Sequence, residues 1–125
     1  MHDVTEGGVL GAVYEMAVAS GNGVTVTNEL LPVANTQKTI CELFGIDYRF
    51  CIGAGAMVMA VTREGSPAVL QRLQEKSIEA TVIGEFTPKE QGYKLIENGL
   101  ENDLPYFSKD PYWQAFFNAY KNGWN

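Results

Sequence analysis

Residues 1–27 read MHDVTEGGVLGAVYEMAVASGNGVTVT, and the order of polar, helical and β-branched segments in this stretch decides the fold. Apolar residues recur at helical spacing over Gly8–Ala19, and Gly21 supplies a C-terminal stop. Thr5 is placed to cap this helix. The β-branched run Val24–Thr27 then predicts a strand. We therefore expect a helix that leads directly into a strand.

Helical and strand patterns keep alternating further along the chain. Helices are expected over Thr36–Phe44, from Ser66-Pro67 to about Lys76 and after Asp110-Pro111, and strands over Met57–Thr62, Ala80–Phe86 and Tyr93–Ile96. The Asn98-Gly99 pair predicts a hairpin turn after the last of these strands. Because helices and strands interleave, we expect an α/β (α+β) fold in which helices pack on a sheet of mixed strand directions.

The same patterns predict helix caps and buried faces. Asn35 and Ser66 are placed to cap the second and third helices. The nearly uninterrupted apolar run over residues 57–62 suits a strand that is covered on both faces. Inward-facing side chains are expected at Ile40, Leu43 and Phe44 in the second helix and at Val69, Leu70 and Leu73 in the third.

Residues 104–125 differ in character from the domain that we expect over residues 1–103. Asp110-Pro111 predicts a capped helix start, and the aromatic residues that follow fall at positions i, i+3, i+4 and i+7: Trp113, Phe116, Phe117 and Tyr120. We expect this helical extension to pack on the same domain, since aromatic side chains bury large areas. The alternative is a docking surface for a partner.

Composition excludes several classes of protein. A chain of 125 residues with 46% hydrophobic and 19% charged residues is typical of one folded domain and not of a disordered chain. A net charge of −6 without a basic stripe argues against nucleic-acid binding. The apolar runs are too short to cross a membrane. We therefore expect a cytoplasmic protein that binds neither nucleic acid nor membrane.

The cysteines and the histidine do not form a metal motif. Cys41 and Cys51 accompany the single histidine, His2, which is too few ligands for a zinc site and too few cysteines for a disulfide framework. Reduced thiols are therefore expected, with Cys41 in the core. A nucleophilic role for Cys51 is disfavoured because no histidine lies near it in sequence. Arg49 is interpreted as an ion-pair partner in preference to a phosphate ligand.

The first eight residues concentrate the candidate site residues. They place two glycines and the Thr5 hydroxyl at the start of a helix, where free backbone N–H groups suit a phosphate or another anion. Asp3 could hold a cation, orient His2 or cap the turn, and His2 could donate to a phosphate oxygen or act as an acid or base. A purely structural role for this glycine-containing helix start remains the alternative.

The segment His2–Gly8, followed by Val9-Leu10-Gly11, resembles the opening of the C-terminal domain in the aminoimidazole ribonucleotide (AIR) synthase superfamily. The nearest branch is the HypE-like hydrogenase maturation branch, whose segment reads Met-His-Asp-Pro-Thr-Arg-Gly-Gly and runs into a helix that ends as Glu15-Met16-Ala17 does here. Thr39–Asp47 and Ile52–Val61 are similar to later family segments. The resemblance covers residues 1 to about 97.

This resemblance implies a PurM C-terminal-domain-like fold that follows an N-terminal domain. The family's N-terminal domain dimerises and binds ATP with Mg²⁺, so the present chain resembles the second half alone, with no cofactor of its own and no activity in isolation. It implies that the chain forms one wall of the active-site cleft of an ATP-dependent synthase or maturation protein. His2 and Asp3 are the implied catalytic residues, and Thr5, Gly7 and Gly8 the implied phosphate-binding residues.

Two departures from the family pattern leave the enzymatic role open. Val4 and Glu6 replace the proline and arginine of the hydrogenase maturation motif, and a negative charge beside an anion site weakens phosphate attraction. The chain also ends without the cysteine to which that branch attaches a carbamoyl group. The alternative is a non-catalytic regulatory or assembly module that uses the aromatic C-terminal helix.

Overall fold

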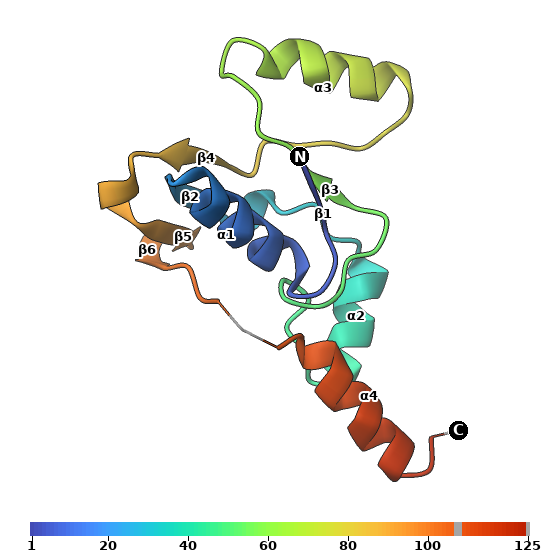
Figure 1. Ribbon diagram of the computed structural model, residues 1–125. Helices are drawn as coiled ribbons and strands as arrows, with labels where there is room; N and C mark the ends of the chain where they lie inside the picture. The colour runs from blue at the N-terminus through green and yellow to red at the C-terminus, as the bar shows by residue number, and fades with distance from the viewer. Residues whose placement is uncertain (107–108, 125) are drawn as a thin grey trace.

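The computed structural model describes residues 1–106 and 109–124, in which helices and strands interleave as expected (Figure 1). The helices are α1 (Gly8–Ser20), α2 (Asn35–Leu43), α3 (Ser66–Glu75) and α4 (Pro111–Lys121), with 3-10 turns η1 (Asn28–Leu30) and η2 (Lys89–Gln91). The strands are β1 (His2–Asp3), β2 (Gly23–Thr27), β3 (Met57–Val58), β4 (Gly84–Thr87), β5 (Tyr93–Glu97) and β6 (Leu100–Asp103).

The main sheet has strands in both directions, as the sequence predicted. Its order is β4-β2-β5-β6, in which β2 runs parallel to β5 and antiparallel to β4. The hairpin between β5 and β6 turns at Asn98 and Gly99, which both have positive φ, as the predicted turn requires. A second, two-stranded sheet pairs β1 with β3, so that His2 lies opposite Val58.

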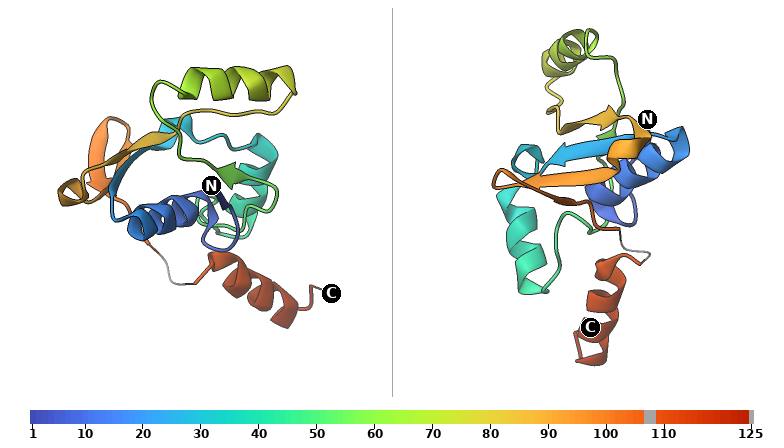
Figure 2. Two further views of the ribbon diagram at one scale, coloured as in Figure 1. Left: turned by 45° about the horizontal axis from the view of Figure 1, so that its top comes forward. Right: turned by 90° about the vertical axis from the view of Figure 1, so that its left-hand side faces the viewer.

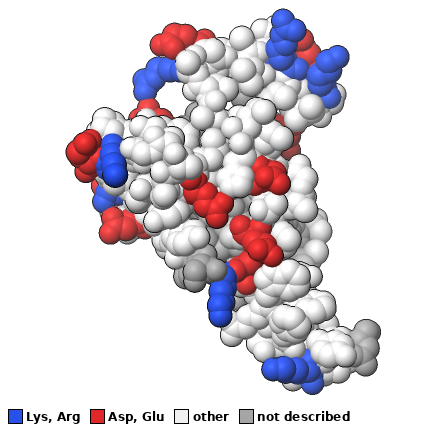
Figure 3. Space-filling view, viewed as in Figure 1, with Lys and Arg blue, Asp and Glu red and all other residues white. Residues whose placement is uncertain are grey.

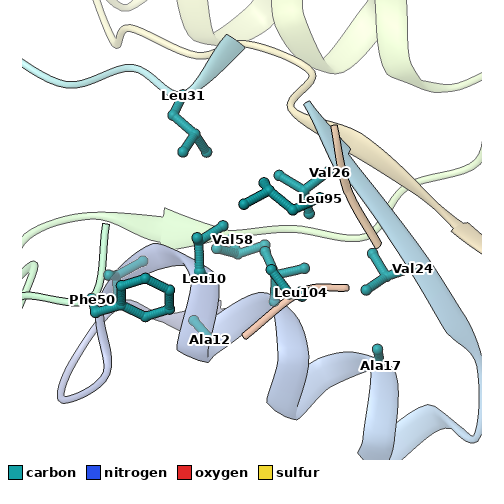
Figure 4. Packing of buried hydrophobic residues seen from close by; sticks show 12 residues of the cluster. Leu10, Ala12, Ala17, Val24, Val26, Leu31, Phe50, Val58, Leu95 and Leu104 are labelled. Atoms are coloured by element: carbon teal, nitrogen blue, oxygen red, sulfur yellow. The ribbon is translucent and has the colours of Figure 1, made fainter. Parts of the chain in front are cut away.

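The core lies between α1 and one face of the main sheet (Figure 4). Leu10 and Ala17 of α1 pack on the same cluster as Val24 and Val26 of β2, and Leu10 and Val26 are fully buried. Leu104, just after β6, joins this cluster. The helix predicted from Gly8 therefore forms, and the sheet covers its apolar face.

The helix starts only partly match the predicted caps. The residue before α1 is Gly7, in a left-handed conformation without a side-chain cap, so the prediction of Thr5 as the cap is wrong. Asn35 and Ser66 are the first residues of their helices and do not cap them. Asp110 does cap α4, because its carboxylate accepts a hydrogen bond from the backbone N–H of Tyr112. The C-terminal stop at Gly21 is also confirmed.

Two predicted strands are shorter than the sequence pattern suggested. Only residues 57–58 and 84–87 are strands in the stretches predicted as 57–62 and 80–86. Met57 and Val61 are exposed, so the expectation of a strand covered on both faces is wrong. In this structure β3 pairs with β1 over these two residues.

Two helices are less buried than predicted. Ile40 and Leu43 of α2 are exposed, Phe44 just after it is partly exposed, and the buried residue of α2 is Cys41. Helix α3 lies apart from the main sheet (Figure 2). It has no buried residue, and its predicted inward-facing side chains Leu70 and Leu73 are half-buried. Amphipathic spacing was read correctly as helical, but it does not show how closely the apolar face is covered.

Charge is distributed unevenly over the surface. On the face shown in Figure 3, acidic side chains gather across the middle of the molecule, whereas the elongated end formed by α4 is largely uncharged. Among residues 1–106 and 109–124, none of the helices has the length and apolarity that a membrane crossing needs.

Candidate functional site

The candidate site lies in the segment that joins β1 to α1. Strand pairing with β3 fixes His2 and Asp3, and the N–H of Val4 donates to the carbonyl of Ala56 at 3.0 Å. The Val4 side chain is buried in the core cluster. Valine therefore anchors this segment at the position where the related motif has proline.

His2 is held between two carboxylates. Its Nε2 lies 2.7 Å from Oε2 of Glu15, and its Nδ1 lies 3.3 Å from Oδ1 of Asp3. The hydrogen bond with Glu15, supported by Asp3, outweighs desolvation and raises the pKa of His2 above 6.5. Both ring nitrogens donate in the protonated form, so the arrangement stabilises an imidazolium. The two carboxylates thus favour the charged form of the ring and accept both of its N–H groups.

Glu15 is a residue of the candidate site that sequence reasoning missed. It lies within α1, thirteen positions from His2, and the helical pattern marks it only as a residue on the polar side. Its role depends on β1 running back beside α1, and the two elements are in contact. No local sequence motif predicts that His2 and Glu15 form a pair.

The glycines at the start of α1 are packed against other parts of the chain. The N–H of Gly7 donates to Oδ2 of Asp110 at 2.9 Å, and the N–H of Gly8 donates to the carbonyl of Thr5 at 3.3 Å. A Cβ on Gly8 would lie 2.7 Å from the backbone of Phe50 and still closer to the carbonyl oxygen of Arg49. Gly8 therefore allows a loop to approach, and its amide already has a partner.

The C-terminal extension contributes the second residue that sequence reasoning missed. Asp110 is 6% exposed, and its Oδ1 accepts from the N–H of Tyr112 at 2.8 Å. The indole Nε1 of Trp113 donates to Oε1 of Glu6 at 3.1 Å. The Asp110-Pro111 pair was recognised as a helix cap, but a sequence pattern cannot show that the same carboxylate reaches Gly7.

The predicted site residues therefore separate into two groups. His2 and Asp3 come together with Glu15, whereas Gly7 comes together with Asp110. Thr5 is exposed and contributes its carbonyl to the turn before α1. A cleft of about 840 Å³ lies beside Gly7 and Glu15, and its charged lining consists of acidic side chains and one lysine: Glu6, Glu15, Asp47, Lys109 and Asp110.

The acidic lining disfavours a free anion. A phosphate in this cleft needs a positive charge beside it, from Lys109 of the lining, from His2 next to Glu15 or from a bound cation. In the described ranges, no three His, Cys, Asp or Glu side chains are grouped to hold a metal ion. The cationic groups at hand are therefore Lys109, which lines the cleft, and His2, which is bonded to Glu15 of the lining.

Arg49 forms ion pairs, as the sequence analysis favoured. Its guanidinium contacts Oδ2 of Asp47 at 2.7 Å and Oε1 of Glu97 at 3.0 Å, and it donates to Oδ1 of Asn28 at 3.1 Å. Burial raises the pKa of Asp47, but the hydrogen bonds from Arg49 outweigh burial, so the net pKa is lowered. Arg49 thus ties three segments together, with its donors directed at protein acceptors.

The two cysteines are free thiols. Cys41 is buried and Cys51 is half-buried. Burial, followed by the neighbouring Cys41, raises the pKa of the Cys51 thiol to about 11. Since the thiolate is the nucleophilic form, this environment argues against a catalytic Cys51.

A larger open groove of about 2370 Å³ lies elsewhere on the molecule. Apolar side chains of α2, α3 and the segments near β3 line much of it, including Ile40, Met59, Leu70 and Val82. None of the five predicted site residues lines this groove. This groove and the candidate site are therefore separate features.

Residues 1–96 match the family described as AIR synthase related protein, C-terminal domain. The carbamoyl dehydratase HypE of Escherichia coli is 34% identical over 97 residues, which are 76% of this chain and 29% of that protein. A hydrogenase expression/formation protein of Methanocaldococcus jannaschii is 33% identical over 94 residues, covering 74% of this chain and 28% of that protein. The chain thus spans less than a third of these relatives.

Solved structures agree with this match. The crystal structure of E. coli HypE superposes with a TM-score of 0.71 at 34% identity and covers 85% of this chain and 35% of that one. HypE from a HypE–HypF complex gives a TM-score of 0.72 at 30% identity, covering 84% and 35%. A HypE crystallised with ATP shares the fold, with a TM-score of 0.76 at 23% identity, covering 87% and 36%. The chain therefore belongs to the AIR synthase related family, as its C-terminal domain, and its relatives here are HypE-like hydrogenase maturation proteins.

Proposed function

We propose that this chain forms one wall of the active-site cleft in a larger, ATP-dependent HypE-like protein, where it contacts a phosphorylated substrate or intermediate. The observation that carries the proposal is the position of His2, held between Asp3 and Glu15 on the strand that leads into α1. A related HypE was crystallised with ATP, which supports nucleotide use by the complete protein.

The proposed chemistry divides the work among four residues. His2, whose pKa is raised, places positive charge near a phosphate oxygen, while its two ring nitrogens stay bonded to Glu15 and Asp3. Asp3 orients the imidazole, and Thr5 and Gly7 provide a hydroxyl and an amide further along the same segment, where the Gly7 amide donates to Asp110. The nearby carboxylates of Glu6 and Asp110 oppose an anion, so we assign the remaining positive charge to Mg²⁺ that accompanies the nucleotide.

We place the ATP and Mg²⁺ sites in an N-terminal domain of the complete protein, together with its homodimer interface. This division is motivated by the share of the relatives that the chain covers, 28% and 29%. The isolated chain is then inactive. Calorimetry tests the division: tight binding of ATP and Mg²⁺ to the isolated chain would contradict it.

The site itself is tested by Asp3→Ala in the complete protein. We expect a reduction in turnover of about tenfold or more without unfolding, because His2 loses one of its two partners. The matched control is Glu90→Gln, in the exposed turn η2, which removes one carboxylate charge away from the site. Wild-type turnover in Asp3→Ala would remove the site assignment.

A second candidate function is a non-catalytic regulatory or assembly module. It is favoured by one observation: Trp113, Phe116, Phe117 and Tyr120 of α4 are each between 43% and 62% exposed. Exposed aromatic stripes on a helix are typical of docking surfaces. Retained partner binding in a complete protein that shows no turnover would support this alternative.

A further inference from the structure

Asp110 joins the N-termini of two helices. One carboxylate oxygen accepts from the N–H of Gly7 before α1, at 2.9 Å, and the other accepts from the N–H of Tyr112 in α4, at 2.8 Å. Burying a carboxylate costs free energy unless hydrogen bonds satisfy it, and here each oxygen has a backbone donor. The N–H group at the start of α1 is the donor that a phosphate oxygen would use.

A second hydrogen bond holds the first turn of α4 in this position. The indole Nε1 of Trp113 donates to Oε1 of Glu6 at 3.1 Å. Glu6 and Gly7 are neighbours in the loop before α1; Asp110 is the N-cap of α4, and Trp113 lies on the first turn of this helix. Figure 1 shows α4 beside this loop. We call this arrangement, with both hydrogen bonds formed, the docked form of α4.

We infer that the docked form of α4 and a phosphorylated ligand exclude each other at the start of α1, with the Asp110 carboxylate acting as an intramolecular occupant of the anion site. This inference rests on the proposed function, which places an anion beside Gly7. The single N–H of Gly7 cannot donate fully to two acceptors, and a phosphate oxygen within its reach would also meet the negative charge of Asp110.

The exclusion makes α4 a regulatory element of the same site. If docking lowers the affinity for an anion, anion binding must weaken docking by the same factor. Because the N–H of Trp113 donates to the carbonyl of Asp110, the two residues move together, and release of the carboxylate also frees the indole from Glu6. A ligand at the start of α1 would therefore change the exposure of the aromatic residues on α4.

The test is a titration of the full 125-residue chain with inorganic phosphate, followed by NMR at the Gly7 amide and the Trp113 indole. Asp110→Asn keeps the size of the side chain and removes its charge, and Trp113→Phe removes the hydrogen bond to Glu6. We expect phosphate to shift both signals in the wild type, and both variants to bind phosphate more tightly. For Asp110→Asn we expect a gain of about tenfold, which corresponds to about 1.4 kcal/mol.

Glu90→Gln is the control for charge, since it also removes one negative charge but lies in η2. Its phosphate affinity should equal that of the wild type. Equal affinities in the wild type, Asp110→Asn and Trp113→Phe, with phosphate still shifting Gly7, would overturn the exclusion and leave the anion site standing. If phosphate shifts the Gly7 signal in none of these proteins, the anion site and the exclusion are overturned together. If Asp110→Asn does not fold, Trp113→Phe carries the comparison, read at Gly7.

Discussion

His2 is the single histidine of the chain, so its ring signals report one titration. We expect a midpoint above 6.5, because Glu15 and then Asp3 favour the imidazolium. Glu15→Gln should lower this midpoint more than Asp3→Asn does, since the hydrogen bond with Glu15 is the larger cause. Proton NMR across pH 5–9, the range in which histidine titrates, measures all three values.

The same titration fixes the sign of a pH effect on stability. A raised pKa in the folded state means that His2 protonation contributes stability below about 6.5, the pKa of the unfolded chain, and that this contribution is lost as pH rises through the folded pKa. Glu15→Gln should flatten this dependence. A midpoint in the wild type at or below 6.5 would contradict the geometry of the His2 site.

Gly8 and Gly45 offer a matched pair for a second test. Both have positive φ, +65° and +64°, but a Cβ on Gly45 meets nothing within 4 Å, whereas one on Gly8 meets the backbone at Arg49 and Phe50. Gly45→Ala should cost about 1 kcal/mol from φ alone. Gly8→Ala should cost about 2–4 kcal/mol, because the loop must also move. Urea unfolding compares them, and equal losses would show that the loop yields freely.

At this scale, local sequence predicted only part of the site. His2 and Asp3 could be named because they belong to one motif, and their role stays a prediction. Glu15 and Asp110 could not, because they reach His2 and Gly7 across thirteen and 103 positions of sequence. Contacts of that kind depend on how β1 and α4 lie against α1, which no local pattern specifies.

Substitutions in α4 test whether its aromatic side chains belong to the core or to the surface. Phe116 and Phe117 are about half exposed, whereas Phe50 is buried in the core cluster. The double variant Phe116→Ala/Phe117→Ala should therefore lose less than about 1 kcal/mol of unfolding free energy. Phe50→Ala, the matched control, should lose about 3–5 kcal/mol. Thermal and urea unfolding measure both; a loss of several kcal/mol in the double variant would place the stripe in the core.

Element type followed from the sequence more reliably than burial did. The helix over α1, its stop at Gly21 and the Asn98-Gly99 turn depend on spacing and on positive φ, which are local properties. The covered strand predicted over residues 57–62 depends on what lies above it. Its apolar sequence is the same whether a neighbour is present or absent, so the exposure of Val61 could not be read from the pattern.

The molecule as a whole is a compact unit from which two helices project. Helix α1 and the four-stranded sheet share one core, while α3 and α4 lie at opposite ends (Figures 1 and 2). Leu104 belongs to that core, although it falls in the stretch predicted as an extension. The connection to α4 therefore starts from a buried residue, which limits how far the first part of the extension can separate from the sheet.

Arg49 is the side chain that links distant segments of this compact unit. Its guanidinium joins Asp47, after α2, to Asn28 in η1 and Glu97 at the end of β5, and its carbonyl accepts from Leu10 of α1. Arg49→Lys should cost about 1–2 kcal/mol of unfolding free energy, because an ammonium cannot reproduce the planar, forked set of hydrogen bonds.

Arg63→Lys is the control for this substitution, since Arg63 pairs with Glu85 where both side chains are largely exposed. It should change stability by less than about 0.5 kcal/mol. The Arg49 contacts also hold the loop that packs against Gly8, so Arg49→Lys should increase hydrogen exchange at the Leu10 amide, which donates to the Arg49 carbonyl. Equal stability losses in the two variants would mean that the Arg49 contacts contribute no more than a surface ion pair.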